Sequence, residues 1–140
     1  MAELPYSTRM ALRYLHQDAV ISIAYDSANH WLYADWQAEQ DSFSVQAGAL
    51  KMLDLLRQEG CRKVLNDNRR VQTIWADASE WGGKVWFPLM IEAGLEYFAW
   101  VYSPNVYSRL STDLTLQHTA KPVVRTFDSI DTASAWLAQM

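Results

Sequence analysis

From residue 20 to its end, the chain alternates short apolar runs with longer segments in which apolar residues recur at helical spacing. Short apolar runs bounded by turn formers are typical of buried strands. Strands that alternate with helices are typical of a largely parallel sheet covered by helices. The chain has 140 residues, which is enough for one domain with a full hydrophobic core. The alternation therefore predicts a single α/β domain.

The predicted elements follow one another in the order β-β-β-α-β-α-β-α-β-α. The strand-like segments are residues 12–16, 20–26, 30–36, 61–66, 98–102 and 122–127, and the helix-like segments are 41–58, 77–94, 103–117 and 128–140. We therefore expect an α/β fold with a mixed sheet of about four or five strands and about four helices, in which an opening hairpin supplies antiparallel edge strands. Residues 1–10 are predicted to be a loose N-terminal lead-in, and residues 11–140 to be the domain.

Capping residues mark the ends of the predicted helices. Asp41 or Ser42 can accept hydrogen bonds from the free N–H groups of the first long helix, and Gly60 can end that helix in the left-handed conformation. Ser103 is the predicted N-cap of a later helix, with Pro104 at its first position.

A polar segment directly follows the apolar run that forms the third main strand. Its members are Asn66, Asp67, Asn68, Arg69 and Arg70. Ligands of α/β sheets bind outside the carboxyl ends of the strands, which makes these five side chains candidate partner- or ligand-binding residues. The alternatives stay open: the amides and carboxylate can instead cap and turn the chain, and the guanidinium groups can form surface ion pairs.

Tryptophan is unusually frequent, with seven residues in this short chain. Trp75, Trp81 and Trp86 lie six and five positions apart, which spreads them around a regular helix, so that at least one should be exposed or line a groove. Trp75 and Trp81 therefore join the candidate binding residues. In the strand at 30–36, Trp31 and Tyr33 share one face. Two interpretations of this face stay open: it packs against a helix, or it contacts a partner or ligand.

Composition and spacing exclude several classes of protein. The net charge of −4 disfavours nucleic acid as a partner. No apolar stretch is long enough for a membrane span. The single Cys61 forms no internal disulfide, which favours a cytoplasmic setting. The three histidines lack metal-ligand spacing, and no cofactor motif occurs, so we expect neither metal nor cofactor. Acid–base catalysis would need Asp67 to meet Asp77 or Glu80.

This order of elements, together with the segments 31–36, 64–69, 94–101 and 127–137, resembles the SpoIIAA-like branch of STAS-type domains. The resemblance covers roughly residues 10–140, and implies a small bacterial cytoplasmic domain without an established activity. STAS anti-anti-sigma proteins carry a phosphorylatable Ser or Thr directly after an Asp. Here Ala78 follows Asp77, and Ser79 comes one residue later, about 100° further around the helix. Phosphorylation of Ser79 is therefore not expected.

Two functions from different classes are consistent with these observations. The first is a non-catalytic STAS-like interaction or regulatory module, not an enzyme, that binds a protein partner or a second copy of itself through residues 66–70 and 75–86. The alternative is a carrier of a small apolar or lipid-like ligand. Its pocket would lie between the sheet and the helix at 77–94, in which Gly82, Gly83 and Pro88 predict a kink that could act as a lid hinge.

Overall fold

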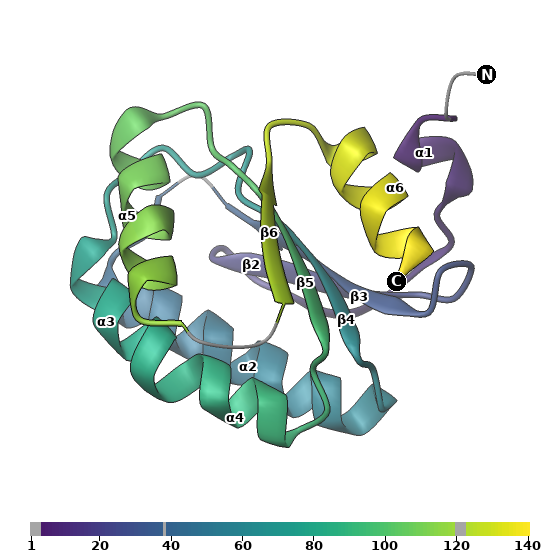
Figure 1. Ribbon diagram of the computed structural model, residues 1–140, viewed down its shortest axis with the longest axis horizontal. Coiled ribbons are helices and arrows are strands. Elements are labelled where there is room, and N and C mark those ends of the chain that lie inside the picture. Colours follow the sequence, from purple (N-terminus) through teal and green to yellow (C-terminus); the bar gives the residue numbers. More distant parts are fainter. Residues whose placement is uncertain (1–3, 38, 120–122) are drawn as a thin grey trace.

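The computed structural model describes residues 4–37, 39–119 and 123–140, and in this part of the chain it shows an α/β fold (Figure 1). Six strands form one mixed sheet in the order β1-β2-β3-β4-β5-β6. The strands are β1 Leu12–Gln17, β2 Ile21–Asp26, β3 Trp31–Trp36, β4 Lys63–Asp67, β5 Tyr97–Val101 and β6 Val123–Phe127. The prediction of an α/β fold with a mixed sheet is confirmed, but the sheet has six strands rather than four or five, because β1 and β6 both pair with a neighbour at the two edges.

Five helices accompany the sheet in the described ranges, and four of them have at least seven residues. Four of them are α1 Tyr6–Arg9, α2 Ser42–Glu59, α5 Val106–Gln117 and α6 Ile130–Gln139. The remaining helix is a continuous segment made of α3 Ser79–Trp81, the π-helical turn η2 Gly82–Trp86 and α4 Phe87–Glu92. The 3-10 turn η1 Ala76–Ala78 leads into α3. No helix in these ranges is both long and apolar enough to cross a membrane.

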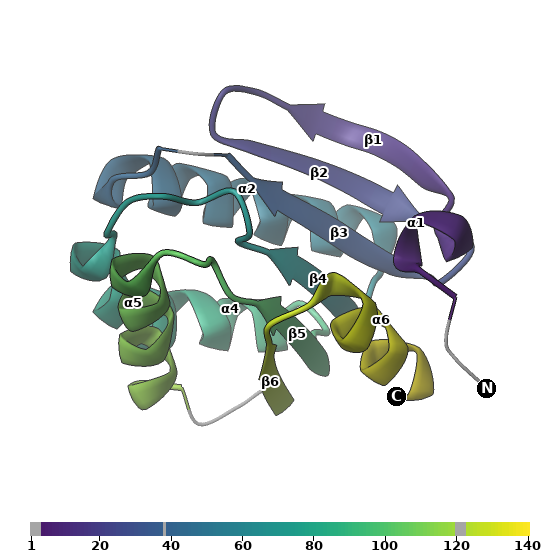
Figure 2. The ribbon, with the colours of Figure 1, turned by 90° about the horizontal axis from the view of Figure 1, so that it is seen from above.

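The helices cover the two faces of the sheet unequally. Strands β3 to β6 are parallel and follow chain order, so right-handed crossovers place α2, the segment from η1 to α4, and α5 on one face. Helices α6 and α1 lie on the other face (Figures 1 and 2). Each face buries its own core. The α2 face includes Leu32, Val64 and Phe87, and the α6 face includes Trp31 and Leu65. Trp31 therefore packs beneath helices rather than facing a partner.

The N-terminal segment differs from the predicted loose lead-in. Tyr6 is 2% exposed, and its hydroxyl donates to Asp26 Oδ2 at 2.6 Å and accepts from Trp31 Nε1 at 3.1 Å. The backbone N–H of Tyr6 donates to Asp131 Oδ1 of α6 at 2.8 Å. Residues 6–9 are therefore an integral part of the fold, because a buried aromatic ring with a satisfied hydroxyl anchors them.

Most of the predicted helix ends are correct. Asp41 and Ser44 form a capping box at the start of α2, and Gly60 ends this helix with φ of 63°. The N-cap of α5 is Asn105 and not Ser103, because the Asn105 side chain accepts from the N–H groups that begin the helix. The hydroxyl of Ser103 donates instead to the carbonyl oxygen of Val71, and so ties the loop after β4 to the end of β5.

The predicted kink at Gly82 and Gly83 is a π-helical turn, in which the N–H of Phe87 donates to the carbonyl oxygen of Gly82, five residues earlier. A Cβ atom on Gly83 would lie 2.5 Å from His118 Cβ and 2.7 Å from Thr115 O, at the end of α5. A Cβ atom on Gly82 would lie 3.2 Å from Thr115 Cγ2. Gly83 therefore permits close packing of α5 on the π-helical turn, which argues against its being a free hinge.

These distances predict different effects for two adjacent substitutions. Gly83→Ala should lower the free energy of unfolding by about 1–3 kcal/mol, because backbone atoms of α5 must move. Gly82→Ala should change it by less than about 1 kcal/mol, since the gain in helix propensity offsets a contact with a movable methyl group. Urea denaturation of both variants checks this, and equal effects would show that α5 does not pack on the turn in this way.

Candidate functional site

The polar segment after β4 is divided between the two faces of the sheet. Asn66, Asp67 and Asn68 are all buried, in the middle of the sheet. Because successive side chains of a strand point to opposite faces, Asn66 faces α2 and Asp67 faces α6. The segment predicted as one binding surface therefore contributes to two separate sites.

Asp67 holds a hydrogen-bond network on the α6 face. Its carboxylate accepts from the Tyr33 hydroxyl at 2.6 Å, from the backbone N–H of Arg69 at 3.0 Å, and from the Arg69 guanidinium at 2.8–3.2 Å. Burial and the charge of Asp67 raise the pKa of Tyr33, and the hydrogen bonds to Asp67 raise the pKa of Arg69. These groups satisfy one another, so the network fixes the loop that follows β4.

Arg70 is engaged in a similar way. Its guanidinium pairs with the carboxylate of Asp35, which lies opposite Asp67 in the register of β3 and β4. Burial and the charge of Asp67 raise the pKa of Asp35, while Arg70 acts in the opposite direction. Arg69 and Arg70 are exposed but paired with carboxylates, so their placement matches the ion-pair alternative.

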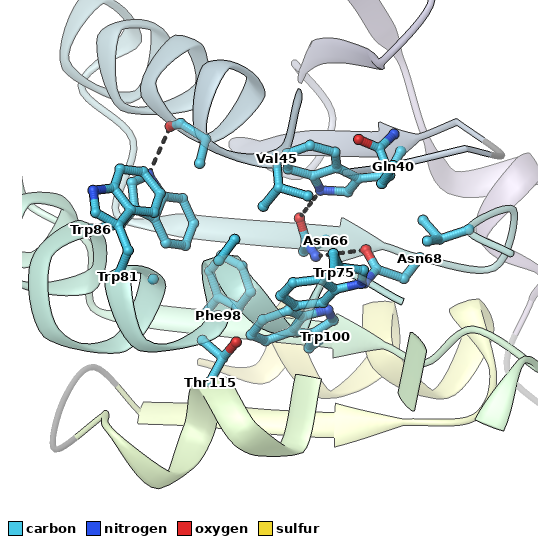
Figure 3. Close-up of a pocket in the computed structure, with 15 residues that line it drawn as sticks. Gln40, Val45, Asn66, Asn68, Trp75, Trp81, Trp86, Phe98, Trp100 and Thr115 are labelled. Carbon is cyan, nitrogen blue, oxygen red and sulfur yellow. Dashed lines mark hydrogen bonds between the residues drawn. The ribbon is translucent and has the colours of Figure 1, made fainter. Parts of the chain in front are cut away.

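A pocket lies on the opposite face, between the sheet, α2 and the segment from η1 to η2. It encloses a void of about 40 Å³, or about 480 Å³ in total with the part that is open to solvent. Five of the seven tryptophans of the chain line it, and we call it the tryptophan pocket. Figure 3 shows the lining residues, which are Trp36, Gln40, Val45, Ala49, Asn66, Asn68, Val71, Trp75, Ala78, Trp81, Gly82, Trp86, Phe98, Trp100 and Thr115.

The tryptophans reach the pocket from four parts of the chain. Trp36 ends β3 and Trp100 lies on β5, next to Asn66 in the strand register. Trp75 precedes η1 and stacks on Trp100, with ring centroids 6.1 Å apart and an interplanar angle of 14°. Trp81 directly precedes the π-helical turn, and Trp86 is the last residue of this turn. Trp81 is the half-buried member of the set, and the other four are buried.

The indole N–H groups of these tryptophans differ in their partners. Trp36 donates to Asn66 Oδ1 at 2.8 Å, Trp75 to Ser108 Oγ at 3.3 Å, and Trp86 to the carbonyl oxygen of Ala49 at 2.7 Å. The N–H of Trp100 is buried and has no hydrogen-bond partner in the described part of the chain. Buried donors are almost always paired, so this group is an exception that calls for an explanation.

The predicted site residues therefore have different positions. Asn66, Asn68, Trp75 and Trp81 come together at the tryptophan pocket, whereas Asp67, Arg69 and Arg70 do not. Ser79 is buried, and its hydroxyl donates to the carbonyl oxygen of Ser111 at 2.8 Å, which leaves no access for a kinase in the folded state.

The sequence interpretation did not identify Trp36, Phe98 and Trp100 as site residues. Strand alternation placed Trp36 on the core face, and that face is where the pocket lies. Phe98 and Trp100 belong to a short apolar run without alternation, so their face could not be assigned from periodicity. No signal in the sequence places them beside Asn66, because that placement depends on the register between β4 and β5.

The residues needed for acid–base catalysis do not converge. Asp67 is buried on the α6 face, whereas Asp77 and Glu80 are exposed on the opposite side of the sheet, where Glu80 pairs with Lys84 at 2.6 Å. Among the described residues, no three His, Cys, Asp or Glu side chains are placed to hold a metal ion. Burial raises the pKa of the Cys61 thiol to about 11, which makes it a poor nucleophile.

No protein-family model matches the chain, and no curated protein sequence matches it. The resemblance to STAS-type domains therefore stays a prediction. The tryptophan pocket is the feature of the molecule from which a function can be inferred.

Proposed function

We propose that the protein binds a small, largely apolar molecule in the tryptophan pocket and catalyses no reaction on it. The observation that carries this proposal is the convergence of five tryptophans and two asparagine amides on one open cavity. Ligand pockets of proteins are concave, mostly apolar and aromatic, and contain a few polar groups that orient the ligand. The pocket also lies near the carboxyl ends of β3, β4 and β5, where α/β sheets bind their ligands.

The size of the cavity limits what it can hold. A void of about 40 Å³ has room for about three water molecules, whereas an engineered cavity that binds benzene measures about 150 Å³. The enclosed void alone is therefore too small for one ring. The ligand we propose is no larger than a single ring with small substituents, and most of it occupies the part of the pocket that is open to solvent. Trp81 can enlarge the space by moving outward, because it is the half-buried member of the lining tryptophans. A lipid chain is a poorer fit.

A second candidate function is the interaction module, and one observation favours it. Four large apolar side chains are exposed near the carboxyl edge of the sheet. Phe43 lies on the first turn of α2, Ile74 precedes η1, and Val106 and Tyr107 lie on the first turn of α5. Exposed apolar side chains that lie near one another are typical of interfaces. Native mass spectrometry of the freshly purified protein separates the two functions, because an interaction module gives a dimer or a complex and a carrier gives a monomer with a small adduct.

Filling the cavity should weaken binding without harming the fold. Ala78 lines the pocket, and the two methyl groups added by Ala78→Val occupy much of a void of about 40 Å³. We expect this variant to bind 4-methylpyridine at least about tenfold more weakly than the wild-type protein, with a free energy of unfolding within about 1 kcal/mol of it. Ligand-observed NMR titration and urea denaturation measure the two quantities.

Ala93→Val is the matched control for this substitution. Ala93 adopts φ and ψ of −78° and −5°, close to the −90° and −8° of Ala78, but it does not line the pocket. This control should bind 4-methylpyridine as the wild-type protein does. Equal binding by wild-type protein, Ala78→Val and Ala93→Val, or no binding by any of them, would contradict the proposed function.

A further inference from the structure

The tryptophan pocket is uncharged. Its lining residues include no Lys, Arg, Asp or Glu side chain among the described residues. A carboxylate or phosphate ligand would lose its hydration there without gaining a counter-charge, and burial of an unpaired charge is strongly unfavourable. The absence of an acidic partner also distinguishes the pocket from a site built to hold an ammonium group by charge pairing. A neutral ligand is the one that this lining accommodates.

The amide oxygens in the pocket wall are already in use. An indole N–H can only donate, so the Trp36 N–H must face the oxygen of Asn66, which fixes the orientation of that amide. The Asn66 Nδ2 group then donates to Asn68 Oδ1 at 3.2 Å, as the dashed lines of Figure 3 show. Gln40 Oε1 accepts from Ser44 Oγ at 2.8 Å. The side-chain amide acceptors of the pocket are therefore paired within the protein.

A donor in the wall is left over. The N–H of Trp100 has no partner among the residues that the structure describes, although Trp100 is only 5% exposed. Trp100 lines the pocket and stacks on Trp75. At the end of the amide chain, Asn68 keeps its own N–H groups for a further partner. The surface of the pocket is therefore almost entirely apolar, and the unused hydrogen-bonding groups beside it are donors set among aromatic rings.

Building on the proposed function, we propose that the ligand is a neutral, flat, single-ring compound that accepts a hydrogen bond from the Trp100 N–H. The acceptor is a ring nitrogen or a carbonyl oxygen conjugated to the ring. Both groups lie in the plane of the ligand, so a flat ligand that packs among the indole rings of the wall can present them to the donor. The ring itself packs against the aromatic rings that line the pocket. The unpaired N–H makes the pocket selective, since a ligand without an acceptor would leave this donor buried and unsatisfied.

Three probes of nearly equal size test this proposal. They are toluene, which has no acceptor, 4-methylpyridine, which accepts through its ring nitrogen and is neutral at pH 8, and N-methylpyridinium, which is a cation without an acceptor. In ¹⁵N-labelled protein, 4-methylpyridine should shift the indole N–H resonance of Trp100 downfield. It should bind about five- to tenfold more tightly than toluene, because one net hydrogen bond is gained.

Substitutions assign the effect to one group. In Trp100→Phe the preference for 4-methylpyridine over toluene should fall to about onefold. In Trp136→Phe it should persist, because Trp136 lies on α6, on the other face of the sheet, and does not line the pocket. The resonance shift in the wild-type protein identifies the donor independently, because Trp100→Phe assigns the signal by removing it.

The outcomes separate this inference from the proposed function. Equal binding of toluene and 4-methylpyridine would overturn the donor assignment and leave the pocket as a binding site. Tighter binding of N-methylpyridinium would also overturn it, and would indicate a cage for cations. If none of the three probes binds, both the proposed function and the ligand class are wrong.

Discussion

Phe87→Ala is expected to lower the free energy of unfolding by about 3–5 kcal/mol, the largest effect that we predict for a substitution in the core. Phe87 is fully buried on α4, directly after the π-helical turn. Its ring centroid lies 4.8 Å from that of Trp86, 5.1 Å from that of Phe98 and 6.1 Å from that of Trp100. Truncation removes these contacts and leaves a cavity that a rigid cluster of rings cannot fill.

Phe43→Ala is the matched control, because Phe43 lies in the first turn of α2 and is 83% exposed. It should change the free energy of unfolding by no more than about 0.5 kcal/mol. Urea denaturation followed by circular dichroism measures both variants. A loss below about 2 kcal/mol for Phe87→Ala would show that the aromatic cluster relaxes around the missing ring.

Asp67→Ala is expected to cost about 3 kcal/mol, because it removes the acceptor of a buried network. The variant leaves the Tyr33 hydroxyl without its partner and releases both the backbone N–H and the guanidinium of Arg69. The loop after β4 should then exchange its amide hydrogens faster. The pKa of Tyr33 should also fall toward its ordinary value, although burial still holds it above that value.

The surface ion pair between Arg62 and Glu96 provides the comparison for this effect. Its nitrogen–oxygen distance of 2.6 Å is as short as the contacts of Asp67, but both side chains are more than half exposed. Glu96→Ala should therefore cost no more than about 1 kcal/mol. Similar losses for Asp67→Ala and Glu96→Ala would mean that burial does not strengthen the Asp67 network, and the loop would not depend on it.

Local signals in the sequence predict the elements of this fold well. The capping residue Asp41 and the left-handed Gly60 mark both ends of α2 because their effect depends only on adjacent residues. Strand alternation likewise predicts that Asn66 and Asp67 point to opposite faces of the sheet. It does not show that their partners are Trp36 and Tyr33, because those contacts depend on the register between β3 and β4.

The packing of α5 could not be predicted from its pattern. This helix buries small hydroxyl residues, Ser108, Ser111, Thr112 and Thr115, and exposes apolar residues such as Tyr107. A hydrophobic pattern would assign the opposite faces. Small side chains are buried here because α5 packs closely on Gly83, and their hydroxyls bond within the helix or to nearby groups. Such a close approach depends on two helices at once, which no single segment reveals.

The strand order has a consequence for how the chain folds during its synthesis. Each strand of the sheet pairs only with the strands before and after it in the chain. A growing polypeptide can therefore add one strand and its helix at a time to an existing edge, without waiting for a distant segment. The contact between the Tyr6 N–H and Asp131 spans 125 positions and needs α6. The N-terminal segment should thus dock last, after α6 has emerged from the ribosome.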